Sequence, residues 1–279
     1  MRSDTLRVPG ATIHYEVRGT GPLLLLIPGG GGDAAVVDPI ADRLAAHFTV
    51  ACLDPRGYSR STIDAGEPLD QRVEVQSDDV HRLITHLTDE PAYVFGGSSG
   101  AIVGLDLLAG YPERVHRLVA HEPPCFAILP DAAAQRAFID EVYALFRAEG
   151  PGAAGARFLA GIGGTMKPLP DSAELPPRAR AMLARLTANF PIMLEHELRQ
   201  FTSHIPHMDA LVTVTDRLVL ASGRDTGLHL PARPAAVLAD QLGMEVTEFP
   251  GGHSGFTDEP EAFADLLVEI FALPAMRTA

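Results

Sequence analysis

The sequence has little cysteine, almost no lysine and no long apolar run. Its 279 residues include two cysteines, Cys52 and Cys125, which lie far apart without metal-type spacing and indicate two reduced thiols rather than a disulfide. The apolar run from Leu23 to Ile27 is far shorter than the ~20 residues that span a bilayer, and no basic-then-apolar leader precedes it. These absences exclude a membrane partner and favour a cytoplasmic location. Lys167 is the only lysine, which we attribute to coding bias.

Positive charge is also scarce. The formal net charge is -14, and the 36 acidic groups are spread along the chain with no acidic tail. Such a potential repels phosphate backbones and anionic lipid, which argues against a nucleic-acid partner. The chain is long enough, and at 46% apolar residues hydrophobic enough, to bury a substantial core without metals or disulfides.

What the sequence does contain is an alternation of short strand-like runs and amphipathic helical patterns. This alternation predicts an α/β fold with a mostly parallel central sheet flanked by helices, preceded by an N-terminal hairpin. Between Pro123 and Asp209 the strand signal stops and only helical patches occur. We therefore expect a core of residues 1–122 and 210–279, interrupted by a helical cap or lid over 123–209. Stretches 161–165 and 168–177 are rich in Gly and Pro and are candidate lid segments.

The pentapeptide "GGSSG" joins an apolar strand-like run to an apolar helical pattern. A nucleophilic serine on such a turn presents its oxygen away from its own backbone, and small residues are required two positions before and two after it. Gly96, Ser98 and Gly100 satisfy this spacing. The following helix points its N-terminus at the reacting oxygen, which favours negative charge there. We predict Ser98 as a nucleophile and the backbone amide of Ser99 as an oxyanion donor.

Four local motifs resemble those of the α/β-hydrolase superfamily, and the resemblance covers nearly the whole chain. They are the segments "LLLLIPGGGGD", "LDPRGYSRS", "GGSSG" and "FPGGHSGF". The resemblance implies a serine-nucleophile, capped member with the chain order Ser, acid, His. It makes Gly30 the second oxyanion donor, although Pro28 stands where the superfamily often has His. The four glycines also resemble a flexible turn or phosphate cradle, but no Lys-Ser/Thr follows to make a nucleotide loop.

The base and acid are expected at other strand ends. His253 follows a strand and a Gly-Gly turn, so it can lie over the strand ends where the nucleophile emerges. Asp225, just after the strand ending near Ser222, is our preferred acid, and Glu122 is the alternative at the preceding strand end. Asp54 is expected instead to brace the loop beneath the oxyanion site together with Arg56.

His204 and His207 raise the question of a metal site. They flank Pro206 on an irregular segment without a nearby carboxylate pair, so we expect neither a metal nor an organic cofactor. A small-molecule substrate is the expected partner, and a homo-oligomer stays open.

The resemblance implies a serine hydrolase that cleaves a carboxylic ester, lactone or related acyl bond through an acyl-enzyme. Apolar residues of the 123–209 segment favour a medium-sized apolar substrate. The same scaffold also supports carbon-carbon bond hydrolysis, acyl transfer or an aminopeptidase, which would use an acidic cap residue such as Glu141, Glu195 or Glu197 to meet the substrate amine. A third class is a receptor-like protein that holds a ligand with little turnover.

Overall fold

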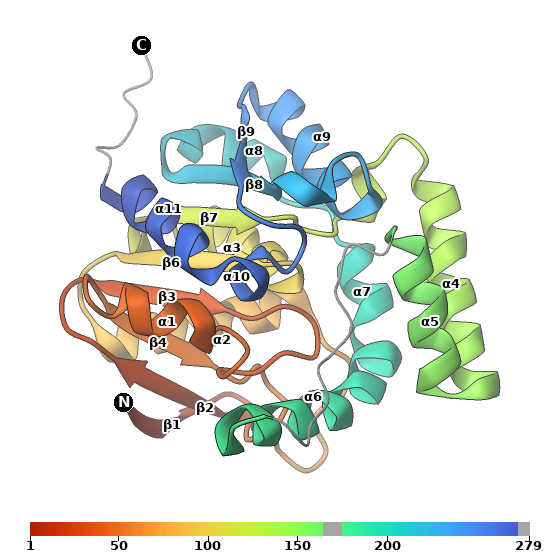
Figure 1. The fold of residues 1–279 in the computed structure, drawn as a ribbon, viewed down its shortest axis with the longest axis horizontal. Coiled ribbons are helices and arrows are strands. Elements are labelled where there is room, and N and C mark those ends of the chain that lie inside the picture. The colour runs from red at the N-terminus through yellow and green to blue at the C-terminus, as the bar shows by residue number, and fades with distance from the viewer. Residues whose placement is uncertain (164–174, 273–279) are drawn as a thin grey trace.

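A nine-stranded sheet runs through the centre of the molecule (Figure 1). The computed structural model describes residues 1–163 and 175–272. The strands are β1 (Arg2–Val8), β2 (Ala11–Arg18), β3 (Leu23–Ile27), β4 (Thr49–Leu53), β5 (Thr62–Ile63), β6 (Ala92–Gly97), β7 (Val115–His121), β8 (Leu218–Gly223) and β9 (Val246–Phe249). They pair in the order β1-β2-β4-β3-β6-β7-β8-β9, and β5 pairs with β2.

The sheet is parallel from β4 to β9, as the alternating pattern predicts. Strand β2 runs antiparallel to each of its neighbours, β1, β4 and β5, and β1 with β2 forms the expected opening hairpin. Parallel strands bring their carboxyl ends to one edge, so the loops that follow β3, β6, β7, β8 and β9 meet there. The α/β fold with a mostly parallel sheet is therefore confirmed.

Helices cover both faces of this sheet. They are α1 (Asp38–Leu44), α2 (Val73–Leu87), α3 (Ser99–Gly110), α4 (Ala132–Glu149), α5 (Pro151–Gly161), α6 (Pro177–His196), α7 (Leu198–Thr202), α8 (Met208–Leu211), α9 (Arg233–Leu242), α10 (Gly255–Asp258) and α11 (Pro260–Ala272). Short 3₁₀ turns are Pro112–Arg114, Phe126–Ile128, Val212–Arg217, Arg224–Thr226 and Leu230–Ala232. In the two described ranges, none of these helices has the length and apolarity needed to cross a membrane.

The hydrophobic core lies on both faces of the sheet, and β3 shows why. All of Leu23–Ile27 is buried, as expected for a parallel strand covered on two sides. Because successive side chains point to opposite faces, Leu24 and Leu26 join a cluster with α1 and α11, whereas Leu25 and Ile27 join a cluster with α2 and α3. A rigid, doubly covered sheet therefore carries the loops at its carboxyl edge.

Helices α4 to α7 lie between β7 and β8 in the chain and beside the sheet in space (Figure 1). The described part of 123–209 contains no strand. Its apolar side chains, among them Phe126, Ile139 and Leu194, pack mostly against one another in a third cluster. Residues 164–174, which include most of the two candidate lid stretches, lie outside the described residues.

Candidate active site

Ser98 occupies a sharp turn between β6 and α3. Its backbone angles are φ 55° and ψ -125°, a combination that residues other than glycine rarely adopt. Such a conformation costs of order 1–3 kcal/mol and persists only where surrounding structure enforces it. The Ser98 amide donates to the carbonyl of His121 on the neighbouring strand at 2.9 Å, and this bond fixes the turn at the carboxyl edge of the sheet.

The glycines that flank the turn are required by close backbone contacts. A Cβ added at Gly96 would lie 2.3 Å from the carbonyl oxygen of Gly100, and one added at Gly100 would lie 2.3 Å from that of Ile27. Neither position can hold a side chain without moving the backbone of α3 or β3. This steric argument accounts for the small-residue spacing seen in the sequence.

The glycine loop after β3 lies directly over Ser98. A Cβ at Gly29 would come 3.1 Å from the Ser98 Cβ, and the Gly32 amide donates to the Gly29 carbonyl at 2.9 Å, closing a tight turn. Across residues 1–163 and 175–272, the amide hydrogens of Gly30 and Ser99 have no hydrogen-bond acceptor. Two uncommitted donors thus flank the serine, an arrangement suited to holding an oxyanion.

His253 is held by Glu122. The His253 Nδ1 lies 2.6 Å from Glu122 Oε2, and the imidazole is 12% exposed while the carboxyl group is fully buried. Glu122 also accepts hydrogen bonds from the Gly223 amide at 2.8 Å and the Ser222 hydroxyl at 3.0 Å. Its φ of 48° is the second unusual backbone angle at this edge. Because the His121 carbonyl accepts from the Ser98 amide, the acid and the serine turn are joined through His121, the last residue of β7, and its neighbour Glu122.

The electrostatics of this pair favour an ionised acid. Burial opposes charge on Glu122, but the hydrogen bond and the positive charge that His253 can offer outweigh it and lower the Glu122 pKa to about 2. An ionised carboxylate only accepts hydrogen bonds, so His253 Nδ1 carries the proton and Nε2 is the acceptor. This tautomer is the one required to take a proton from a hydroxyl.

The preferred acid, Asp225, does not meet His253 in the structure. It lies in the 3₁₀ turn after β8, is exposed, and its carboxylate pairs with Arg224 at 3.1 Å. The Asp225 amide is tied to the Gly251 carbonyl, which holds the turn on the surface. The expected contact between Asp225 and His253 is therefore wrong. His253 instead contacts Glu122, the alternative acid.

Asp54 and Arg56, expected together to brace the loop, have separate partners. Asp54 is buried and pairs with Arg60 at 2.8 Å, whereas Arg56 pairs with Asp79 at 2.6 Å. Asp54 nevertheless braces the glycine loop, because it accepts a hydrogen bond from the Ala34 amide at 2.9 Å. The side chain therefore lies beneath the oxyanion loop as expected, but with another cation as its partner.

Helix α6 contacts the same loop through Asn189, which the sequence did not single out. Glu197, which the sequence offered only as a contact for a substrate amine, lies close by. The Asn189 amide group donates to the Gly31 carbonyl at 2.9 Å and accepts from the Ser59 amide at 3.0 Å. Just beyond the helix, Glu197 is buried and accepts a hydrogen bond from the Tyr58 hydroxyl at 2.5 Å. No local pattern marks these residues, since each acquires its role only when α6 packs on the core.

His121 is a buried histidine without a polar partner. Neither ring nitrogen has a hydrogen bond among the described residues, and the ring packs against Phe249 and Phe263 with centroids 5.8 and 5.4 Å away. Burial lowers its pKa to about 4, despite the opposing charge of Glu122. Because the folded pKa lies below the ordinary value of 6.5, unfolded chains bind the proton first, and stability falls as the pH drops from 6.5 towards 4.

We therefore expect His121→Phe to make the protein less acid-sensitive. At pH 5 the histidine costs the wild type about 2 kcal/mol relative to neutral pH, from a 1.4 kcal/mol change for each unit of pKa difference. Urea unfolding at pH 8 and pH 5 measures this loss, and the variant is expected to lose less between the two pH values. An equal loss of unfolding free energy in both proteins would show that groups other than His121 cause the loss of stability at acid pH.

Two other features of the molecule lie away from this edge. In the described ranges no three His, Cys, Asp or Glu side chains come together to hold a metal ion, and His207 instead faces Asp106 at 3.5 Å.

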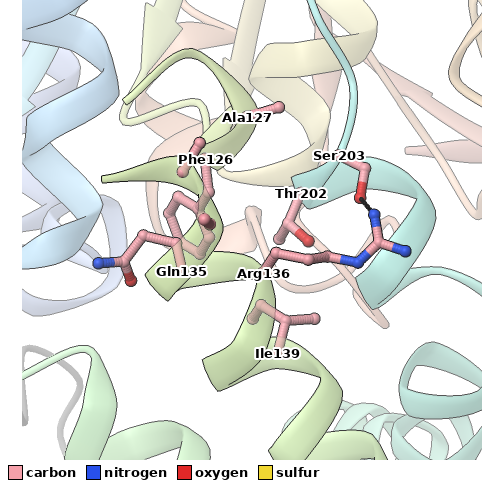
Figure 2. Close-up of a pocket in the computed structure, with 9 residues that line it drawn as sticks. Phe126, Ala127, Gln135, Arg136, Ile139, Thr202 and Ser203 are labelled. Carbon is pink, nitrogen blue, oxygen red and sulfur yellow. Dashed lines mark hydrogen bonds between the residues drawn. The ribbon is translucent and has the colours of Figure 1, made fainter. Parts of the chain in front are cut away.

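A pocket of about 270 Å³ opens between α4, α7 and the turn at Phe126. Figure 2 shows Arg136 reaching across it to Ser203. Neither Ser98 nor His253 lines this pocket.

The chain resembles known proteins along its whole length. Residues 22–161 match the model of the alpha/beta hydrolase fold family. An uncharacterized hydrolase of Bacillus subtilis, YraK, is 38% identical over 96% of this chain and 95% of its own. A zearalenone hydrolase of Bionectria ochroleuca is 27% identical over 95% and 96% of the two chains. The structure of an esterase from Exiguobacterium antarcticum superposes with a TM-score of 0.75 at 18% identity, covering 95% and 97%. The chain therefore belongs to the α/β-hydrolase fold family and is a hydrolase of that family.

Proposed function

We propose that this hydrolase cleaves a carboxylic ester, lactone or related acyl bond of a small apolar substrate through an acyl-enzyme on Ser98. The observation that carries the proposal is a strained Ser98 turn that is bonded to His121, next in the chain to the Glu122 that holds His253 at the same edge of the sheet. A hydroxyl group on a strained turn, beside two amide donors without an acceptor, is the arrangement expected of a serine nucleophile.

In this mechanism His253 Nε2 takes the proton of Ser98 as the hydroxyl oxygen attacks the substrate carbonyl. The amides of Gly30 and Ser99 stabilise the oxyanion, and Glu122 stabilises the positive imidazole. His253 then gives the proton to the leaving group. Water attacks the acyl-enzyme in a second cycle of the same steps and releases the acid. No metal or cofactor enters these steps.

We also propose that residues 123–209 form a cap that shapes the substrate site. The contacts of Asn189 with the glycine loop and of Glu197 with Tyr58 support this role, because they place α6 and α7 over the loop that carries Gly30. Met193 faces the same loop. A cap so placed supplies apolar walls around the scissile bond.

The aminopeptidase alternative has little support from the acidic residues of the cap. Glu141 pairs with Arg157 at 2.8 Å, and Glu195 pairs with Arg147 at 2.9 Å. Both are occupied by cations at the surface, and Glu197 is buried with one of its oxygens bonded to the Tyr58 hydroxyl group. Carbon-carbon cleavage, acyl transfer and ligand holding stay as outcomes of the test below.

A panel of esters and lactones tests the proposal, with products identified by mass spectrometry and the protein titrated with a fluorophosphonate. We expect turnover of short-chain nitrophenyl esters and stoichiometric labelling of one serine. Rapid labelling without turnover of any ester or lactone would favour a receptor-like protein. Transfer of the acyl group to an added alcohol in preference to water would favour an acyltransferase.

A further inference from the structure

Glu197 is a buried acid with one unsatisfied oxygen beside the oxyanion loop. Its side chain is 2% exposed, and Oε2 accepts the hydrogen bond of Tyr58, itself fully buried. The other oxygen, Oε1, is buried and has no hydrogen-bond partner among the described residues. An unsatisfied buried oxygen costs of order 1–3 kcal/mol, and more if it is charged, so its retention at this place calls for an explanation.

The position of Oε1 points to the substrate side. A methyl group added at Gly30 would lie 2.7 Å from Oε1 and 3.0 Å from the Ser99 hydroxyl oxygen. The orphan oxygen is therefore adjacent to both residues whose amides flank Ser98. Gly30 is exposed, and Ser98 and Ser99 are partly exposed, so this corner is open to an incoming molecule.

The surroundings of Glu197 favour the uncharged acid. The groups packed around its carboxyl are Tyr58, Ser99, Met193 and Gly30, and of these only Tyr58 titrates. No basic side chain pairs with Glu197 in the described ranges. Burial raises its pKa, although the hydrogen bond from Tyr58 and the nearby Ser99 hydroxyl group partly offset the rise. Because Tyr58 donates to Oε2, the proton of the neutral acid belongs on Oε1.

We propose that Glu197 is a third oxyanion contact, which as an uncharged carboxylic acid donates its Oε1–H to the substrate oxygen held by the Gly30 and Ser99 amides. This inference rests on the proposed acyl-transfer function. A donor aimed at developing negative charge in a dry site stabilises the transition state more than the ground state. An ionised Glu197 has the opposite effect, because it places a like charge beside the oxyanion.

Two substitutions at this position separate the charge from the hydrogen bond. Glu197→Gln keeps the size and an N–H donor, and we expect its kcat at neutral pH within about 3-fold of the wild type. Glu197→Leu removes the donor, and we expect kcat to fall about 10- to 100-fold with KM changed less than about 3-fold. Glu195→Gln, two residues earlier and paired with Arg147, is the matched control and should leave both constants unchanged.

The alkaline side of the pH profile gives a second readout. The wild-type kcat should decline at high pH as Glu197 ionises, and Glu197→Gln should lack this decline. Tyr58→Phe removes a donor that stabilises the carboxylate, so the Glu197 pKa rises and the decline should move to higher pH. A role limited to holding α6 and α7 in place predicts none of these pH shifts.

The outcomes distinguish this inference from the proposed function. If the wild type neither turns over esters nor labels with fluorophosphonate, the proposed function fails. If the wild type is active but Glu197→Leu has wild-type kcat, or Glu197→Gln loses as much kcat as Glu197→Leu, the oxyanion contact is overturned. Should Glu197→Leu fail to fold, the pH profiles decide, since a wild-type alkaline decline in both Glu197→Gln and Tyr58→Phe contradicts the proposal.

Discussion

Ser98→Ala should lower kcat/KM for any ester that the wild type hydrolyses by at least about 10⁴-fold. Without the hydroxyl no acyl-enzyme forms, and only binding and the two amide donors remain to accelerate attack by water. The fold should persist, because alanine occupies no more space than serine and the turn is held by the Ser98 amide bond to His121. Steady-state kinetics with a nitrophenyl ester, together with the thermal unfolding midpoint, measures both expectations.

Ser203→Ala is the matched control for this substitution. It removes a hydroxyl at the end of α7 that contacts Arg136 at 3.3 Å and lies away from the turn. Its kcat/KM should match the wild type. If Ser98→Ala retained more than about a tenth of the wild-type activity with an unchanged unfolding midpoint, Ser98 would not be the nucleophile.

Glu122→Gln should lower kcat by about 10³- to 10⁴-fold with little change in KM. The amide is neutral, so it cannot stabilise the positive imidazole, and its NH₂ group can face His253 and favour the wrong tautomer. The hydrogen bonds from Gly223 and Ser222 can still end on the amide oxygen, so folding should survive. The activity should be measured across pH, so that a loss of kcat is not confused with a shifted pH optimum.

Asp225→Asn tests the competing acid with the same change of charge. Since Asp225 is exposed and paired with Arg224, its loss should change kcat less than about 3-fold. The reverse pattern, an inactive Asp225→Asn and an active Glu122→Gln, would mean that the loops after β8 and β9 rearrange in the working enzyme. That result would restore the acid first favoured by the sequence.

The serine turn was predictable from sequence because its constraints are local. Gly96 is set by a clash with the Gly100 carbonyl inside the turn, which depends on residue spacing alone, and only the Gly100 clash with Ile27 of β3 needs the packed sheet. The parallel sheet was predictable for the same kind of reason, because each strand carries its own apolar run. β3, for example, spans Leu23–Ile27, the apolar run seen in the sequence.

The acid could not be chosen from sequence, since Glu122 and Asp225 both follow strands that end at the same edge. The choice depends on how far each loop travels after its strand. Glu122 stays in the plane of the sheet, bonded to the Ala221 carbonyl, whereas Asp225 turns outward. One signal did distinguish them: Asp225 has a basic neighbour, Arg224, to pair with, and Glu122 is followed by two prolines. The pairing of Asp54 with Arg60 was missed because it too depends on the path of a loop after a strand.

The environment of Glu197 could not be predicted from the sequence. Its partner Tyr58 lies 139 positions away, and its burial depends on α6 and α7 packing onto the glycine loop. A lone glutamate near the end of a helix gives no sequence signal for this environment. Only the packed structure shows that one of its oxygens lacks a partner.

Peptide mass spectrometry after rapid quenching of the reaction tests the nucleophile most directly. The protein is mixed with excess nitrophenyl ester, quenched in acid within the first turnover and digested, and the acylated residue is located by fragmentation. We predict an acyl group on Ser98 and none on the adjacent Ser99. Turnover that proceeds with no acylated serine, or with the acyl group on another residue, would contradict the account.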